Sequence, residues 1–194
     1  MGSFCQSFHF RTDDRDAVIA AARAIARKED VELLVAKSKG GWINVYAAND
    51  VWHPRHAAAI SKACKAEHSL LFYLHDSDID FYWYHRKGVL KDRFMSCPDY
   101  FGKAKKSDML AVGNPDAFSD LLTAAAARKQ LKKLVSGRIV NGECIGECPD
   151  LEDDRLEALA RLFGVTGAMT SFEALQEGEK IKGLGGLNDM KLIK

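Results

Sequence analysis

The segment YLHDSDIDFYWYH holds the side chains of this chain that are best placed to do chemistry. It carries carboxylates at Asp76, Asp78 and Asp80 and imidazoles at His75 and His85. A calcium loop of the EF-hand type also begins with Asp at alternate positions, but it needs Gly at its sixth position and Glu at its twelfth. This chain has Phe and Lys there, so the segment lacks two required residues of that motif.

Two interpretations of the segment remain. Asp and Ser are residues that tight turns select, because their side chains hydrogen-bond the local backbone. We therefore predict that DSD forms the turn between two strands. The alternative is a small metal-dependent hydrolase, with His75, Asp78 and His85 as catalytic residues and with His75, Asp76 and Asp78 as metal ligands.

Aromatic residues follow this turn. On a strand, Tyr82 and Tyr84 point to the same face as Asp80, whereas Trp83 points to the opposite face. Tyr and Trp are enriched in protein interfaces and often dominate their binding energy. We predict that Tyr82, Trp83 and Tyr84 bind a partner, and the sequence leaves open which of the two faces the later helices cover.

Cys144 and Cys148 form the second group with possible chemistry. A structural zinc site needs four ligands, usually as two closely spaced pairs, and no second pair of this kind follows. We favour two free thiols in a loop, with a disulfide or a weak metal site as alternatives. Cys64 and His68 are four residues apart, but their pairing is better explained by a helix that buries Cys64 than by a catalytic thiol.

Other signatures of chemistry are absent from the sequence. It contains no phosphate-binding loop, no nucleophile elbow and no zinc-protease motif. The basic run at residues 128–138 is interleaved with Leu and Val, which is typical of an amphipathic helix with a solvated charged face; an acidic partner or nucleic acid is the alternative. We predict no cofactor.

Composition and charge limit the possible partners. The 194 residues are 47% hydrophobic and 28% charged, as in ordinary globular proteins. The formal net charge is only +1, so nucleic acid is not the expected partner. No segment approaches the ~20 apolar residues that span a bilayer. The odd number of cysteines, five, favours reduced thiols and a cytoplasmic protein.

Hydrophobic periodicity predicts the elements that position these residues. Strands are expected at residues 3–10, 31–38, 42–48, 69–75, 79–86 and 89–96, and helices at 14–29 and 53–68. The order β-α-β-β-α-β-β-β predicts an α+β fold, a two-layer sandwich with both helices on one face of a mostly antiparallel sheet.

The second half of the chain reads as helical. Helices are expected at residues 117–137 and 151–164 and in a short segment after the cap Ser171. We therefore divide the chain into an α/β sandwich at 1–97, a helical part at 98–182 that packs on it, and a flexible glycine-rich tail at 183–194. All three parts could form one domain.

Two segments carry a resemblance. LLFYLHDSDIDFYWYHRKGVLKDRFMSCPDYFG and LARLFGVTGAMTSFEALQEGE, together about a quarter of the chain, resemble segments of uncharacterised bacterial intracellular proteins. The resemblance implies a sheet followed by helices, and it assigns no activity and no site residues.

We therefore expect a non-enzymatic binding protein that recognises another protein through a sheet face or edge. A toxin-neutralising immunity protein is one protein of this class, by analogy alone. Homo-oligomers are compatible with this expectation. The alternative is the metal-dependent hydrolase with its site at residues 75–85.

Overall fold

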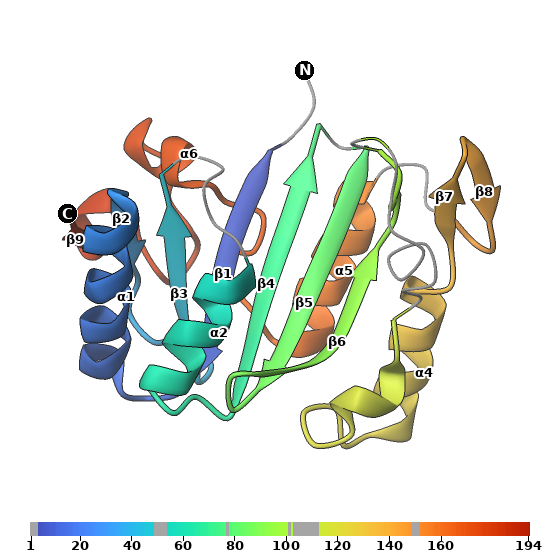
Figure 1. Cartoon of the computed structure of the whole chain (residues 1–194), viewed down its shortest axis with the longest axis horizontal. Helices are drawn as coiled ribbons and strands as arrows, with labels where there is room; N and C mark the ends of the chain where they lie inside the picture. Colours follow the sequence, from blue (N-terminus) through green and yellow to red (C-terminus); the bar gives the residue numbers. More distant parts are fainter. Residues whose placement is uncertain (1–3, 49–53, 77, 101, 103–112, 149–151) are drawn as a thin grey trace.

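A computed structural model describes residues 4–48, 54–76, 78–100, 102, 113–148 and 152–194. Its central element is a seven-stranded antiparallel sheet with the strand order β6-β5-β4-β1-β3-β2-β9 (Figure 1). The strands of this sheet are β1 Cys5–Arg11, β2 Leu33–Val35, β3 Trp42–Ala47, β4 His68–His75, β5 Ile79–Arg86, β6 Val89–Met95 and β9 Lys191–Ile193. The helices are α1 Arg15–Glu29, α2 Pro54–Ala63, α4 Ala125–Leu134, α5 Glu152–Phe163 and α6 Phe172–Gln176, with 3-10 turns η1 Pro115–Phe118 and η2 Leu187–Asp189.

The first six elements form the core of the sheet. Their order is β-α-β-β-α-β, and the four strands lie as β4-β1-β3-β2, the arrangement of a ferredoxin-like unit. The next two strands, β5 and β6, extend the β4 side through short turns. The predicted α+β class and the predicted order of the first eight elements are confirmed.

Helices α1 and α2 lie on one face of this sheet, as predicted. Asp14 caps α1 by accepting a hydrogen bond from the backbone N–H of Ala17, and the apolar stripe of Val18, Ala22 and Ala26 is buried. Together with α2 these residues cover β1, β2, β3 and one side chain of β4, Leu71. In Figure 1 both helices lie in front of one half of the sheet, and no described helix lies in front of the upper part of β4 and β5.

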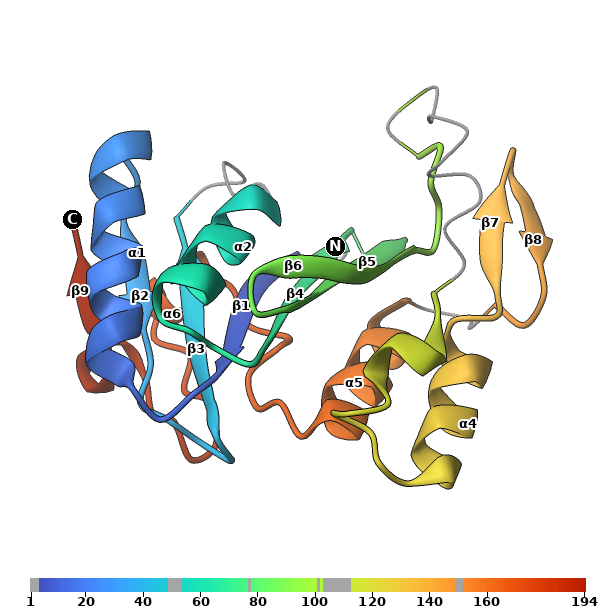
Figure 2. The ribbon, with the colours of Figure 1, turned by 60° about the horizontal axis from the view of Figure 1, so that its bottom comes forward.

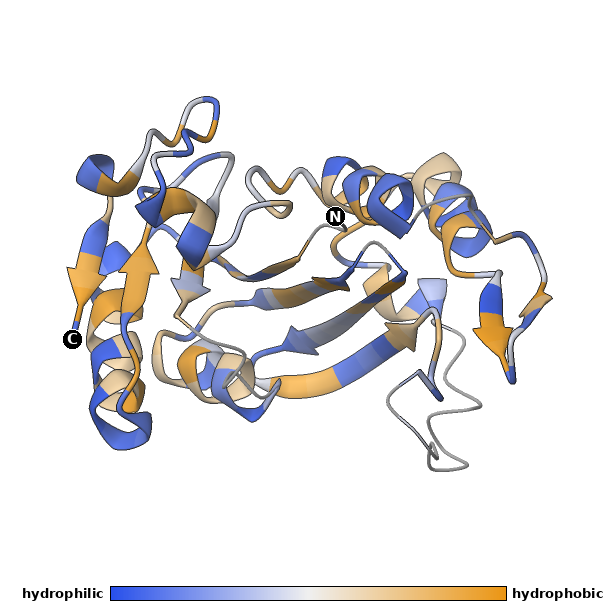
Figure 3. Cartoon of the chain, turned by 90° about the horizontal axis from the view of Figure 1, so that it is seen from above, coloured by the Kyte–Doolittle hydropathy of each residue, from blue (hydrophilic) through white to orange (hydrophobic). Residues whose placement is uncertain are grey.

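The opposite face is covered by the C-terminal elements, which give the molecule a third layer (Figure 3). Side chains of η1, α4 and α5 pack on β4, β5 and β6. Farther along the same face, α6 and the loop after it pack on β2 and β3. The helical part therefore covers the face of Tyr82 and Tyr84.

Three local predictions need correction. The predicted helix at 117–137 is divided into η1 and α4, and the Arg128 guanidinium donates to the carbonyls of Leu122 and Thr123 at the break. A two-stranded hairpin, β7 Arg138–Val140 and β8 Glu143–Ile145, stands beyond α4, apart from the large sheet (Figure 2). The tail at 183–194 is not a flexible extension, because its strand β9 pairs with β2 and buries Ile193.

None of the helices in the described part of the chain has the length and apolar composition that crossing a bilayer needs.

Candidate functional site

The segment YLHDSDIDFYWYH contains the end of β4, a turn and most of β5. The backbone N–H of Asp78 donates to the carbonyl of His75 at 3.0 Å, and Asp76 has a positive φ of 53°. Asp and Asn are the non-glycine residues that most readily adopt this conformation. The turn is therefore present where it was predicted, and Asp76 and Asp78 are exposed on it.

The structure does not bring the proposed hydrolase residues together. His75 pairs with Ile79 in the β4–β5 ladder, whereas His85 pairs with Ser69, six residues farther along β4. At about 3.3 Å per residue the two imidazoles lie about 20 Å apart. His85 is buried, which lowers its pKa to about 4. The described residues contain no group of three or more His, Cys, Asp or Glu side chains that could hold a metal ion.

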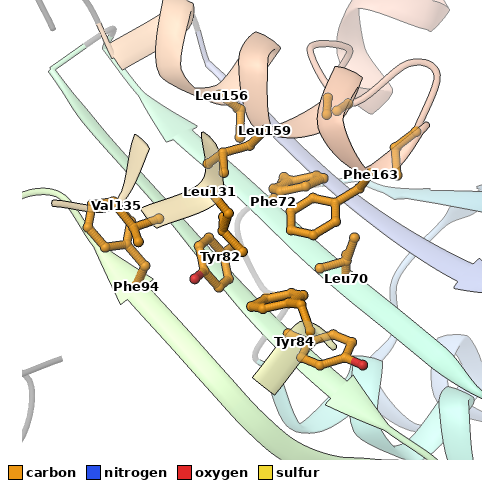
Figure 4. Close-up of a cluster of buried hydrophobic side chains, with 14 of the residues drawn as sticks. Leu70, Phe72, Tyr82, Tyr84, Phe94, Leu131, Val135, Leu156, Leu159 and Phe163 are labelled. Carbon is orange, nitrogen blue, oxygen red and sulfur yellow. The ribbon is translucent and has the colours of Figure 1, made fainter. Parts of the chain in front are cut away.

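Tyr82 and Tyr84 are core residues. Both side chains are 0% exposed, and Figure 4 shows them among the apolar side chains of the α4 and α5 layer. The Tyr82 hydroxyl donates to the Asp92 carboxylate at 2.7 Å, and the Tyr84 hydroxyl is hydrogen-bonded to His68 Nδ1 at 2.8 Å. The prediction that these two rings bind a partner is corrected, because the C-terminal elements cover them. Trp83, on the opposite face, is partly exposed.

Trp83 belongs to a strip of aromatic rings on the face that α1 and α2 cover only in part. The rings come from the end before β1, from β4 and β5, and from the segment after β6. We call them the aromatic strip: Phe4, Tyr73, His75, Phe81, Trp83 and Tyr100. Phe4 is 55% exposed and Tyr100 39% exposed, values that are high for large aromatic side chains.

The rings of the strip contact one another both face to face and edge to face. Tyr73 lies between Phe81, at 4.4 Å with an interplanar angle of 13°, and His75, at 6.1 Å and 10°. The stacked pairs thus close one face of Phe81 and of His75, and both faces of Tyr73 lie toward neighbouring rings. Trp83 meets Phe81 edge to face at 4.7 Å.

A hollow of about 480 Å³ lies beside the strip. Phe4 and Tyr73 form one side of it, and Ser171 and Glu173, at the start of α6, line it as well. Its remaining lining includes Cys5, a buried thiol whose pKa burial raises to about 12. Because the thiolate is the reactive form of cysteine, this hollow is suited to binding and not to thiol chemistry.

The structure also contains a buried ionic cluster that the sequence analysis missed. On the helix-covered face of β5, Asp80 lies 3.3 Å from Arg155 Nη1, and Glu152 Oε2 lies 3.2 Å from the same nitrogen. All three residues are at most 4% exposed. Burial and the neighbouring carboxyl raise the pKa of Glu152, and burial raises the pKa of Asp80, so the pair favours a proton on one of the two carboxyls. The cluster joins the first turn of α5 to the start of β5.

The pKa of Glu152 makes the stability of this cluster dependent on pH. Burial and the nearby Asp80 carboxylate raise the Glu152 pKa from 4.5 to about 9. Between these values the folded chain holds a proton that the unfolded chain lacks, so the free energy of unfolding falls as pH rises, by up to about 1.4 kcal/mol per pH unit. We expect Glu152→Gln to flatten this fall between pH 6 and 8, measured by urea unfolding followed by Trp fluorescence.

Glu157→Gln is the matched control for this measurement. Glu157 is an exposed carboxylate on the same helix, where it pairs with Arg161. Its replacement should leave the pH dependence of the wild type intact. If the free energy of unfolding fell equally with pH in the wild type and in Glu152→Gln, Glu152 would not hold the proton in the folded chain.

A second buried polar group joins β1 to β3. The Ser7 hydroxyl lies 2.8 Å from His9 Nε2, and His9 Nδ1 lies 2.8 Å from the Asn44 side-chain oxygen. The order hydroxyl, imidazole, amide is that of a nucleophile, its base and an orienting group. All three residues are at most 1% exposed, however, and burial lowers the His9 pKa to about 4. Their partners include the carbonyls of Thr166 and Ala168, so the group holds the loop after α5 against the sheet.

The cysteines differ from the prediction in one respect. Cys144 and Cys148 form a disulfide that closes a short ring at the end of the β7–β8 hairpin, so the interpretation as two free thiols is wrong and neither sulfur is a metal ligand. Cys5, Cys64 and Cys97 are free and buried. Cys64 follows the end of α2 and His68 belongs to β4, where it bonds Tyr84, so the two do not form a catalytic pair.

The aromatic strip and the hollow beside it are the features best suited to recognise a ligand. Alternation of side chains along β5 was the signal for the strip, since it places Phe81 and Trp83 together on one face. The contributions of Phe4, Tyr73 and Tyr100 come from other segments and need the strand order. No known protein family, no curated protein and no solved structure matches this chain.

Proposed function

We propose that this protein is a non-enzymatic binding module that recognises a partner protein through the aromatic strip. The observation that carries the proposal is a row of partly exposed aromatic rings on the sheet face that α1 and α2 cover only in part. Neutralisation of a toxin is the specific form of this function that we propose. We place it in the cytoplasm, where the three buried thiols stay reduced and the Cys144–Cys148 disulfide would be open to reduction.

Three properties of the strip support protein recognition. Its strands lie within the sheet, so a partner meets a surface that is already ordered and pays little conformational entropy. Aromatic side chains provide much of the binding energy in protein interfaces. The neighbouring hollow of about 480 Å³ can receive an anchoring side chain of the partner.

The ring geometry favours a protein over single-stranded nucleic acid. Nucleic-acid platforms stack bases on open aromatic faces. In the strip, Tyr73 and Phe81 stack on each other at 4.4 Å, so each closes one face of the other to a base. Ring edges carry partial positive charge and attract carbonyl and carboxylate oxygens, which a polypeptide supplies.

The proposal predicts that Phe81→Ala weakens partner binding. Loss of a central ring of an interface costs roughly 2 kcal/mol or more, so the Kd should rise at least about thirtyfold. A partner captured from a lysate of the source organism would be identified by mass spectrometry, purified and titrated against both forms by calorimetry.

Ile145→Ala is the matched control, because Ile145 is 50% exposed on β8, away from the large sheet. It should leave the Kd unchanged. Circular dichroism of both variants checks that the fold is retained. A purified partner that binds wild type and Phe81→Ala with the same Kd would remove the strip from the interface and overturn the proposal.

A further inference from the structure

We propose that the partner segment is acidic and that its carboxylates bind in a basic hollow at the lower end of the same face. This inference rests on the proposed function and specifies the chemistry of the partner. The hollow has a volume of about 200 Å³ and is lined by Ser61, Lys62, Lys65 and Lys87. We call it the lysine hollow.

One tight turn of the backbone holds Lys87 beside α2. Lys87 and Gly88 form the two-residue turn between β5 and β6, and both have positive φ, as a type I′ turn requires. A Cβ at Gly88 would lie 2.8 Å from Lys62 Cβ and 3.0 Å from the Ala58 carbonyl. Only glycine allows the turn to approach α2 this closely, and the approach fixes Lys87 beside Lys62.

The charges of the hollow are only partly balanced within the described chain. Glu67 lies 3.3 Å from Lys87 Nζ, and it also bonds the Arg86 guanidinium at 3.0 Å. Among the described residues, no acidic side chain lies within ion-pair distance of Lys62 or Lys65. An anionic ligand would relieve the mutual repulsion of the lysines, so the hollow is complementary to carboxylates.

Apolar and basic surfaces follow one another along this face. Phe81, Trp83 and the buried His85 alternate along β5 toward the turn that carries Lys87, and six residues of extended chain span about 20 Å. Leu90, opposite His85 in the ladder, is 45% exposed between the two ends. An extended partner segment of about six residues could therefore place an apolar side chain on the strip and acidic side chains in the lysine hollow.

A second copy of the chain is a less suitable partner than an acidic segment. A second copy of the chain could add its own β6 to the open edge of β6, but that strand carries Lys91 and Arg93. In an antiparallel pairing centred on Asp92 these two cations would lie opposite each other, and like charges in that position are destabilising.

Hexaglutamate is the probe for the lysine hollow. In a ¹⁵N NMR titration at low salt, its largest chemical-shift changes should fall on Lys62, Lys65, Lys87 and their neighbours, and binding should weaken as salt is added. The triple variant K62Q/K65Q/K87Q should lower the affinity about tenfold. The control K180Q/K182Q/K191Q removes the same charge from exposed positions between α6 and the start of β9 and should have no effect.

Two results would overturn the inference. One is an equal loss of hexaglutamate affinity in both triple variants, which would mean that only net charge matters. The other is tighter binding of hexathymidylate than of hexaglutamate, which would assign the hollow to phosphates. The hexaglutamate titration does not depend on the Phe81→Ala experiment. If hexaglutamate binds the lysine hollow but Phe81→Ala leaves partner binding unchanged, the proposed function fails while the charge preference of the hollow stands.

Discussion

Arg155→Met should destabilise the fold by about 3–5 kcal/mol, because it leaves the Asp80 carboxylate buried without a cation. Asp80 is 0% exposed and Arg155 2% exposed, so water cannot replace the lost partner without opening the layer between α5 and the sheet. The Arg155 guanidinium also lies 5.1 Å from the centre of the Phe94 ring, a cation–π contact that the substitution removes. Urea unfolding at pH 7 measures the change.

Arg161→Met on the same helix is the control. Arg161 pairs with Glu157 at 2.9 Å, but both side chains are more than half exposed, so we expect a loss below about 0.5 kcal/mol. The double variant Asp80→Asn/Arg155→Met should recover part of the loss, since it removes both charges together. If Arg155→Met alone lowered the free energy of unfolding by less than about 1 kcal/mol, the Asp80 carboxyl would not carry a buried charge that needs Arg155.

Tyr82→Ala should cost a similar amount, about 3–5 kcal/mol, through the cavity that it leaves in the core. The Tyr82 ring packs against Phe94, at 5.9 Å, and Phe118, at 5.7 Å, under the α4 layer. Tyr82→Phe keeps the ring and removes only the hydrogen bond to Asp92, so it should cost about 1 kcal/mol. Thermal and urea unfolding of both variants give the comparison.

The same pair of variants separates a core role from an interface role for Tyr82. If Tyr82 were an interface anchor, Tyr82→Ala would lower partner affinity and leave the free energy of unfolding nearly unchanged. The burial of the ring predicts the reverse order of effects. A Tyr82→Ala chain as stable as the wild type would show that the ring is not part of the core.

The sequence was sufficient for elements whose signals are local. The turns at Asp76–Asp78 and at Lys87 and Gly88 come from residue types that select those backbone conformations. The short helix after Ser171 comes from its cap, whose side chain accepts from the N–H of Ala174. The faces of α1 and α2 come from helical periodicity alone.

The ionic cluster could not be found in this way, because Asp80 and Arg155 are 75 residues apart in the sequence. From the sequence alone, Arg155 cannot be distinguished from the solvent-exposed charges of an amphipathic helix. One signal was available: strand alternation places Asp80 on the same face as Tyr82 and Tyr84. Once that face is covered, a buried carboxylate needs a cation or a proton, and here the cation is Arg155.

The prediction missed the strand β9 for a related reason. Its residues, Lys191–Ile193, have no strong strand pattern, and glycines precede them, so the local sequence favours a loop. Pairing with β2 gives the segment its structure, and only the tertiary fold supplies that partner. The division of the helix at 117–137 has the same origin, since the packing of η1 on the sheet decides it.

The coverage of β4 and β5 by later elements has a consequence for protein synthesis. The apolar side of these strands, with Phe72, Tyr82 and Phe94, leaves the ribosome well before α5 and its Phe163 are made. At about 5–20 residues per second, the intervening chain takes on the order of ten seconds to translate. During that interval the nascent chain exposes the largest apolar surface of its sheet, so we expect chaperone dependence and aggregation to be greatest before α5 is complete.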